Sequence, residues 1–525
     1  MPHSLRGPRR SRSRSSESPA SAPRDAAPLD AAPRDAAPRD APPRPGGGPS
    51  HAEHGVHLAF GADPATSMVV SWITREPVVR PLARVVTGTA EAVREVGAGT
   101  RSYTDAVTGW EIYAHHALLD ELAPDTEYTY EITYQTTAAG VVREVGRASF
   151  RTAPRGRAAF TFACFGDHGT DASDNPFGTP ASSALVAGVE RVDPLFTLVD
   201  GDLAYSNVSD VPPRAWADWF AMISTSAARR PWMPSVGNHE TERGNGALGL
   251  AAYQTYFQPP DNGEEPYLAG LWYAFTVGGV RFVVLSGDDV CYQDAGRVYL
   301  HGYSSGRQTA WLERQLAEAR ADQAVDWIIV VLHQAAVSTA EFHNGADLGL
   351  REAWLPLFDQ YGVDLVISGH EHHYERTHPL RGVVDGSATL TPRPVPGSVS
   401  VAGGGGGGTA TLDTSAGTVH MLIGTGGSST PSAGQLFDPP ACRVVVGVRE
   451  REPGQRQRSS IRAVEPAPWL AARFPEHPYA FAALTVDPGE PGGTTRIQVT
   501  VYDSADAVPV PFDTFTLARP RADAT

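Results

Sequence analysis

Short runs in which apolar and polar residues alternate dominate residues 54–153 of the chain. Turn-forming residues separate these runs, which lie at His57–Phe60, Met68–Thr74, Thr126–Tyr134 and Gly146–Thr152. Strands with one buried face alternate in this way, so the segment is predicted to be a small all-β domain. Trp72, on an early strand, is expected to fill the space between two packed sheets. The domain also contains two consecutive histidines, His115 and His116. Consecutive side chains point to opposite faces of a strand, so we expect no metal site there.

From about residue 157 the pattern changes to longer apolar runs that alternate with amphipathic stretches. The apolar runs have the length of buried strands and lie at Ala158–Phe165, Leu195–Val199, Phe282–Leu285, Trp327–Leu332 and Val363–Ile367. Apolar residues at helical spacing predict helices between them, at Ala181–Glu190, Arg214–Ile223 and Gln308–Arg320. Tyr273–Ser286 contains Gly278-Gly279 between two β-rich runs and is predicted to be a hairpin. The alternation predicts a layered α/β domain with helices on both sides.

Two segments lack these patterns. Residues 1–50 repeat a unit rich in Pro, Ala and Arg, and proline at that density prevents both helices and sheets. We therefore predict that residues 1–50 are a disordered tail, with nine Arg against five acidic residues. The run Gly403–Gly408 is predicted to lie in a flexible Gly-rich insertion around residues 382–417.

The charge composition narrows the possible functions. All 43 basic residues are Arg, there are 59 acidic residues, and the formal net charge is −16 at pH 7. A generic nucleic-acid binder needs surplus positive charge, so we expect no nucleic-acid partner. The apolar runs are far shorter than the ~18–20 residues that cross a bilayer, so we expect no membrane partner. No apolar stretch follows Arg9-Arg10, so no signal peptide is recognisable.

Polar residues follow almost every predicted strand of the α/β segment. In chain order they are Asp167; Asp202 and Tyr205; Asn238 and His239; His333; and His370 and His372. A strand end fixes its side chains rigidly, and the carboxyl ends of neighbouring parallel strands meet along one edge of a sheet. The sequence therefore predicts that these side chains surround a common point.

These residue types indicate which ligand they would hold. Carboxylate, amide, phenol and imidazole groups suit Fe, Mn or Zn, and a tyrosine phenolate favours a hard trivalent ion such as Fe(III). Even with His239 left out, the remaining seven ligands are too many for one ion of coordination number four to six, and they suit two ions that share a bridging carboxylate. Two metal ions roughly 3.5–4 Å apart stabilise both the attacking and the leaving oxygen of a phosphoryl displacement.

The five motifs, in this order, resemble the metallophosphoesterase superfamily. The tyrosine in GDLAY and the block GHEHHYER narrow the resemblance to the purple acid phosphatases, over roughly residues 54–515. It implies a combined α+β and α/β architecture. A fibronectin type III-like β-sandwich at 54–153 would precede a four-layer αββα catalytic domain at 157–515. It also implies an extracytoplasmic or secreted protein.

The resemblance also implies a role for each residue. Fe(III) would be bound by Asp167, Tyr205 and His372. A divalent ion (Zn, Fe or Mn) would be bound by Asn238, His333 and His370, and Asp202 would bridge the two ions. His239 would contact the substrate phosphate and protonate the leaving oxygen. His343, ten residues after His333, is either a second phosphate contact or a solvated loop histidine, and the adjacent family histidine is Phe342 here.

The implied function is that of an acid phosphatase, which hydrolyses monoesters of a small phosphorylated substrate with a metal-bound hydroxide. Two alternatives stay open: a metallophosphoesterase acting on phosphodiesters or nucleotides and, more remotely, a non-catalytic surface binding protein. GDLAYSN lacks the Asp-Arg-Gly of the Ser/Thr protein phosphatases, which disfavours that branch. The oligomeric state stays open. Glu375 and Arg376, at the end of the last motif, are expected to form a structural ion pair.

Overall fold

The structure is a computed structural model of the chain. It describes residues 54–87, 93–137, 140–172, 174–401, 409–428, 435–455, 457–506 and 508–524. The chain divides into two compact units, Met1–Pro45 and Gly46–Thr525, and all the elements named below belong to the second unit. The predicted tail, residues 1–50, and the run Gly403–Gly408 lie outside the described residues.

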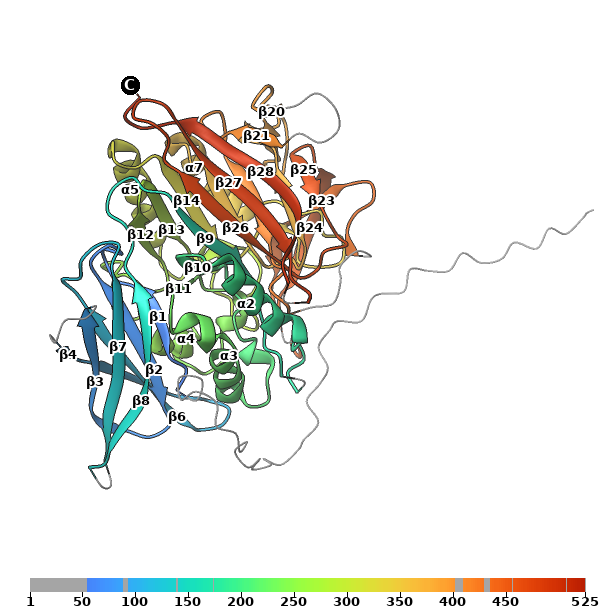
Figure 1. Cartoon of the computed structure of the whole chain (residues 1–525). Helices are drawn as coiled ribbons and strands as arrows, with labels where there is room; N and C mark the ends of the chain where they lie inside the picture. The colour runs from blue at the N-terminus through green and yellow to red at the C-terminus, as the bar shows by residue number, and fades with distance from the viewer. Residues whose placement is uncertain are drawn as a thin grey trace, which may run out of the picture. The chain divides into compact units, whose positions relative to one another are not determined.

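Two four-stranded antiparallel sheets form the N-terminal β domain (Figure 1). One sheet has the order β1 (His57–Phe60), β2 (Met68–Thr74), β6 (Glu111–Leu119) and β5 (Gly99–Thr104). The other has the order β4 (Val93–Gly97), β3 (Val78–Thr87), β7 (Glu127–Thr136) and β8 (Val142–Arg151). Trp72 of the first sheet and Tyr130 and Ile132 of the second are fully buried in one core cluster. The predicted β-sandwich and the buried position of Trp72 are confirmed.

Truncating Trp72 is expected to lower the stability of this domain strongly. Its indole is 0% exposed, so Trp72→Ala removes a large buried side chain and should cost about 3–5 kcal/mol. The shift of the urea unfolding midpoint measures this loss. Trp110 is 45% exposed, and Trp110→Ala should change stability by no more than about 0.5 kcal/mol. Equal losses in the two variants would contradict the core position of Trp72.

The rest of the described chain contains two large mixed sheets. The first has the order β11 (Trp232–Pro234), β10 (Phe196–Val199), β9 (Phe160–Phe165), β26 (Ala480–Asp487), β27 (Thr494–Asp503), β28 (Val510–Pro520), β21 (Ala410–Asp413) and β20 (Val399–Val401). The second has the order β12 (Tyr273–Val277), β13 (Val280–Val284), β14 (Trp327–Leu332), β16 (Leu365–Ser368), β22 (Val419–Ile423), β17 (Tyr374–Thr377) and β25 (Leu470–Arg473). The strands and the hairpin predicted from the sequence all appear in these sheets.

The two sheets pack face to face, and helices cover their outer faces. Because side chains alternate along a strand, β9 directs Phe162 towards the second sheet, with its ring centroid 5.1 Å from that of Phe282. The next residue along the strand, Ala163, points to the opposite face and belongs instead to a core cluster with the helices, as does Phe165. The helices that cover the outer faces are α2 (Pro180–Val192) and α3 (Pro212–Ala227) on the first sheet, and α5 (Arg307–Ala321) and α7 (Leu355–Tyr361) on the second. The predicted four-layer αββα domain is confirmed.

Shorter elements complete the domain. They are η1 (Ser206–Val208), η2 (Asn238–Glu240), α4 (Ala251–Tyr256), η3 (Gly287–Asp289), β15 (Ala346–Asp347), α6 (Leu348–Ala353), β18 (Leu380–Val383), β19 (Pro392–Pro394), β23 (Ala441–Arg449) and β24 (Ser459–Pro466). The strands β15, β23 and β24 form a small sheet of their own. Cys164, Cys291 and Cys442 are free, buried thiols. Among the described residues, no helix combines the length and the apolar character that a membrane span requires.

The sandwich contacts the α/β domain through hydrogen bonds to backbone carbonyls. Tyr130 Oη donates to the carbonyl of Ala228 at 2.7 Å, and His116 Nε2 lies 3.0 Å from the carbonyl of Thr255.

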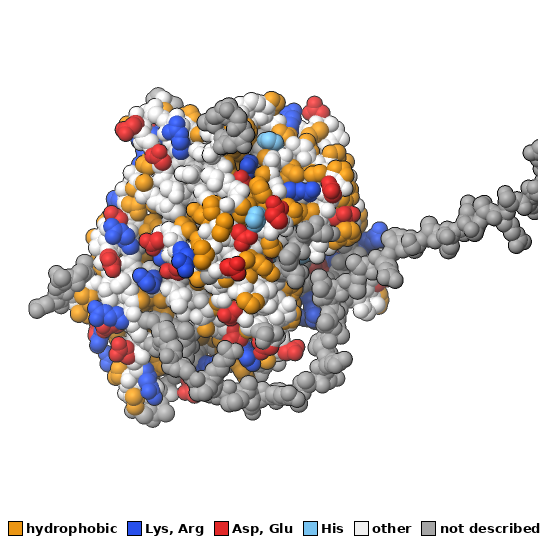
Figure 2. All heavy atoms as spheres, turned by 45° about the vertical axis from the view of Figure 1, so that its right-hand side comes forward, with side chains coloured by type: hydrophobic (Ala, Val, Ile, Leu, Met, Phe, Trp, Pro, Cys, Tyr) orange, Lys and Arg blue, Asp and Glu red, His pale blue; other side chains and the backbone are white. Residues whose placement is uncertain are grey.

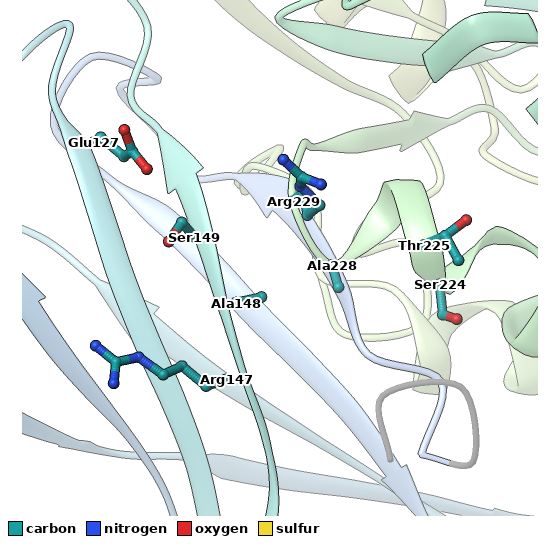
Figure 3. A pocket seen from close by; sticks show the side chains of 8 residues that line it. All are labelled: Glu127, Arg147, Ala148, Ser149, Ser224, Thr225, Ala228 and Arg229. Carbon is teal, nitrogen blue, oxygen red and sulfur yellow. The ribbon is translucent and has the colours of Figure 1, made fainter. Parts of the chain in front are cut away.

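A cavity of about 360 Å³ lies at this junction, beside β8 and the end of α3 (Figure 3). Its walls are formed by Glu127, Arg147, Ala148, Ser149, Ser224, Thr225, Ala228 and Arg229. None of the seven predicted metal ligands lines it, so this cavity is separate from the predicted metal site.

Candidate metal centre

The polar motifs lie where strands of the two large sheets end. Asp167 follows β9, Asp202 and Tyr205 follow β10, and Asn238 and His239 begin η2 after β11. These three strands are parallel neighbours in the first sheet. His333 directly follows β14, and His370 and His372 follow its parallel neighbour β16 in the second sheet. Since both sheets present carboxyl ends of parallel strands at this edge, the five loops meet.

Asp167, Tyr205 and His372 form one group of donor atoms. Tyr205 Oη lies 3.2 Å from Asp167 Oδ1 and 3.2 Å from His372 Nε2. His372 Nε2 lies 3.1 Å from the same Asp167 oxygen. The hydroxyl of Ser428 donates to Tyr205 Oη at 2.9 Å. The structure thus brings together the three ligands predicted for Fe(III), in buried positions.

A second group forms around His333. Burial would lower the pKa of its ring, but the Asp202 and Asp167 carboxylates outweigh burial and raise it. Its Nδ1 lies 2.8 Å from the carbonyl of Asp200 and must donate there, so Nε2 is the atom that holds either a proton or a metal ion. That Nε2 lies 3.1 Å from Asn238 Oδ1, 3.1 Å from Asp202 Oδ2 and 3.2 Å from His370 Nδ1. Lone pairs that converge in this way repel one another unless a cation joins them. The donor set therefore fits a metal ion, with Asp202, His333 and His370 offering ligand atoms within 4.8 Å of one another.

Asp202 acts on both groups, since its Oδ2 lies 3.1 Å from His333 Nε2 and its negative charge contributes to the pKa of Asp167 and of Tyr205. Burial would raise the pKa of the Asp202 carboxyl, but His333 and His239 outweigh burial and hold the pKa below its ordinary value. Burial and the negative charge of Asp202 act to raise the pKa of Asp167, but His372 and His333 outweigh them and hold it below its ordinary value. Asp202 Oδ1 accepts the backbone N–H of His239 at 2.8 Å, and a Cβ on Gly237 would lie 2.3 Å from this oxygen. Glycine at position 237 therefore lets the carboxylate lie where a bridging ligand is needed.

The backbone at this edge is held in a rarely adopted conformation. Positive φ angles occur at Asp167 (57°), Asp202 (52°), Tyr205 (50°) and His370 (72°), which are four of the seven predicted ligands. A non-glycine residue in this region costs on the order of 1–3 kcal/mol, and such costs persist where the surrounding structure enforces them. The packed sheets therefore place these side chains in advance of any ligand.

His239 lies at the edge of the donor groups. Its Nδ1 lies 2.7 Å from Asn207 Oδ1, and its ring centroid is 4.4 Å from that of Tyr205. Its Nε2 is 4.0 Å from Asp202 Oδ2, farther than the 3.1 Å of His333 Nε2. Burial lowers the pKa of His239. Asn207 thus fixes the ring with Nε2 directed to the site.

His343 also comes to this site. Its ring centroid lies 4.8 Å from that of His372, and its side chain is 28% exposed. Glu371, which is fully buried, lies 3.1 Å from His343 Nδ1 and accepts the backbone N–H of Gly345 at 2.7 Å. Burial would lower the pKa of His343, but the Glu371 carboxylate outweighs burial and raises it. The sequence allows two interpretations of His343, and this position favours a residue that faces the site over a solvated loop histidine.

Several supporting residues have no role assigned from the sequence. Gln293 Nε2 lies 3.1 Å from His370 Nε2, on the side of the ring away from His333. A histidine that binds metal through one nitrogen commonly donates its other N–H, and an amide oxygen from a flipped Gln293 would accept it. The Glu240 carboxylate accepts the backbone N–H groups of Asp202 (2.9 Å) and Leu203 (2.8 Å). Gln293 lies in a loop outside the motifs and Asn207 lies in η1, two residues after Tyr205, and only the tertiary structure reveals their partners.

Comparisons with known proteins agree with this geometry. Residues 54–152 match the family described as purple acid phosphatase, N-terminal domain, and residues 160–374 match calcineurin-like phosphoesterase. An uncharacterized protein of Mycobacterium tuberculosis is 48% identical over 483 residues, which cover 89% of this chain and 87% of that protein. Fe(3+)-Zn(2+) purple acid phosphatase 12 of Arabidopsis thaliana is 25% identical over 339 residues, which cover 62% of this chain and 66% of that protein.

A solved structure shows the same fold. Purple acid phosphatase PPD1, isolated from yellow lupin seeds, aligns with a TM-score of 0.63 at 20% sequence identity. The alignment covers 90% of this chain and 75% of that chain. The order of the motifs, the N-terminal β domain and the four-layer catalytic domain agree with the matched families, and the chain therefore belongs to the purple acid phosphatase family of metallophosphoesterases.

Proposed function

We propose that this protein is an acid phosphatase that hydrolyses phosphate monoesters of small molecules at a centre of two metal ions. Fe(III) would be held by Asp167, Tyr205 and His372, and a divalent ion (Zn, Fe or Mn) by Asn238, His333 and His370. Asp202 would bind both ions. The observation that carries the proposal is the convergence of two buried donor groups, each with distances of 3.1–3.2 Å, on both of which Asp202 acts.

The side chains around the centre would perform the proton transfer and the binding of phosphate. Two bound cations supply an activated water molecule and offset the negative charge of the phosphate. His239 Nδ1–H donates a hydrogen bond to Asn207 Oδ1, so Nε2 of the protonated ring holds the proton that the leaving oxygen takes. His343, positioned by Glu371, contacts the phosphate from the other side of the pocket. No covalent intermediate on a Ser or Cys side chain is needed.

Metal analysis combined with two aryl substrates tests the proposal. The purified protein should contain iron and a second metal, and it should hydrolyse an aryl phosphate monoester faster than the matching bis-aryl diester. A chelator should abolish this activity, and adding back iron with zinc or manganese should restore it. Faster turnover of the diester would instead favour the phosphodiesterase alternative. A folded, metal-loaded protein inactive on both esters would favour the non-catalytic alternative.

The colour of the protein tests the ligand role of Tyr205. A phenolate bound to Fe(III) absorbs visible light by charge transfer to the metal, so the oxidised protein should be coloured. Tyr205→Phe should abolish the visible band while the far-ultraviolet circular dichroism spectrum stays unchanged. Tyr303→Phe, which removes a half-buried phenol outside the site, should keep the band. An Fe(III)-containing wild-type protein without a visible band would remove Tyr205 from the ligand set.

A further inference from the structure

A β-hairpin adjoins the loop that carries His343. The hairpin consists of β23 and β24, and the short strand β15, which follows that loop, pairs with β23 in parallel. A Cβ on Gly345 would lie 2.4 Å from the carbonyl oxygen of Arg443, so the loop and the hairpin are in direct contact. At the other end of the hairpin, Arg458 forms an ion pair with Asp294 at 3.2 Å. The hairpin is therefore fixed at both ends beside the candidate centre.

Two arginines of this hairpin lie next to His343. Arg462 Nη1 donates to the backbone carbonyl of His343 at 3.4 Å. The register places Arg443 opposite Val464 and Arg462 opposite Val445, so the two arginines are diagonal neighbours on one face of the hairpin. Burial and the positive charge of Arg443 lower the pKa of Arg462, while the Glu371 carboxylate acts to raise it. Arg462 therefore lies within electrostatic reach of both groups.

Neither guanidinium has a carboxylate partner in the part of the chain that the structure describes. Neighbouring arginines differ in this respect, since Arg351 binds Glu465 at 2.8 Å and Arg458 binds Asp294. Arg462 is exposed and Arg443 half-buried, with the guanidinium carbon of Arg443 6.0 Å from the ring of Phe437. Two adjacent positive charges without a directly paired carboxylate repel each other, and an anionic group placed between them relieves this repulsion.

We infer that Arg443 and Arg462 bind a second phosphate group of the substrate, so that the enzyme prefers monoesters that carry another phosphate. This inference rests on the proposed function, because His343 links the arginines to the pocket for the scissile phosphate. Guanidinium groups bind phosphate oxygens in a bidentate manner, and two of them match the charge of a phosphate dianion. Phe342, beside His343, is 59% exposed and adds no positive charge to the pocket mouth.

A homologous series of substrates tests the inference. Alkanediol bisphosphates with three to six carbons are compared with the alkyl monophosphates of the same length, which lack only the second phosphate. For the best chain length, kcat/KM should favour the bisphosphate at least about tenfold. In the double variant Arg443→Gln/Arg462→Gln this preference should fall to about twofold or less. The preference should also weaken as ionic strength rises.

A matched variant and a binding measurement complete the test. Arg449 is an exposed arginine at the end of β23. Arg449→Gln removes a positive charge from the same hairpin and should not alter the preference for the bisphosphate. Calorimetry should show weaker binding of the bisphosphate to the double variant independently of turnover. If the preference for the bisphosphate survives in the double variant, the inference is overturned. It is also overturned if an enzyme that is active on aryl phosphate shows no such preference at any chain length. Neither result contradicts the proposed function. Equal preference for ω-carboxyalkyl phosphates overturns the assignment to phosphate. Inactivity of wild type on every monoester contradicts the proposed function instead.

Discussion

Replacing Asp202 with alanine is expected to remove bound metal and turnover together. The carboxylate acts on both donor groups, with Oδ2 3.1 Å from His333 Nε2, and it is the only one of the seven ligands proposed to bind both ions. Loss of a residue that merely supports a metal ligand costs about 10- to 100-fold in affinity or activity. Loss of a shared ligand should therefore exceed roughly 100-fold. Elemental analysis of the purified variant, together with kcat/KM on an aryl phosphate, measures both effects.

Two further variants distinguish the loss of the Asp202 negative charge from a nonspecific effect of mutation on the structure. Asp202→Asn keeps an acceptor for the His239 backbone N–H but removes the negative charge, so it should also lose metal. Asp210→Ala removes an exposed carboxylate eight residues away and should keep both metals and full activity. If Asp202→Ala retained two metal ions per chain, Asp202 would not be the bridging ligand.

Replacing His239 with alanine should give a different result, in which metal is kept and turnover is lost. His239 Nε2 is the proposed proton donor to the leaving oxygen, and loss of such a group typically costs roughly 10²–10⁴-fold. The loss should be smaller for an aryl phosphate, because a weakly basic phenolate leaves without much protonation. It should be largest for an alkyl phosphate, whose alkoxide needs the proton.

The same substrates test how His239 is held in place. Asn207→Ala removes the acceptor at 2.7 Å that fixes the ring, so it should show the same dependence on the leaving group with a smaller loss. If His239→Ala loses metal, His239 is itself a ligand. If its loss is equal on aryl and alkyl phosphates, His239 binds the phosphate and does not act as the acid.

The positions of the predicted ligands could be read from the sequence because each follows a recognisable strand. A buried strand ends where its apolar run ends. The run Phe160–Phe165 therefore predicts the position of Asp167, and the run Trp327–Leu332 predicts that of His333. Local pattern is sufficient for this, because the parallel sheets then bring the strand ends together without further information. The fold class follows from the same alternation.

Contacts between distant segments could not be read in this way. Glu375 and Arg376 were expected to form an ion pair, and this expectation is wrong, because neighbours on β17 point to opposite sides. Glu375 accepts the hydroxyl of Thr339 at 2.7 Å, whereas Arg376 pairs with Asp513, also at 2.7 Å. The partners come from residues far away in the sequence, and no local signal identifies them. The same holds for Gln293 at His370 and for the arginines of β23 and β24.

One face of the molecule shows how charge is distributed outside the buried centre. Acidic side chains gather along the middle of this face among apolar ones, and arginines lie around them singly or in small groups (Figure 2). The overall charge of −16 would weakly repel anionic substrates at long range. Local arginines are therefore the features that can attract a phosphorylated substrate to the site.

The strand order of the first sheet has a consequence for the synthesis of the protein on the ribosome. β9, which leads to Asp167, pairs on one side with β10 and on the other with β26, which is made roughly 300 residues later. At about 5–20 residues per second, the growing chain would expose this unpaired strand edge for roughly 15–60 seconds. Unpaired edges invite association between chains. We therefore expect the yield of soluble protein to depend on chaperones during translation, and a chain truncated before β26 to aggregate.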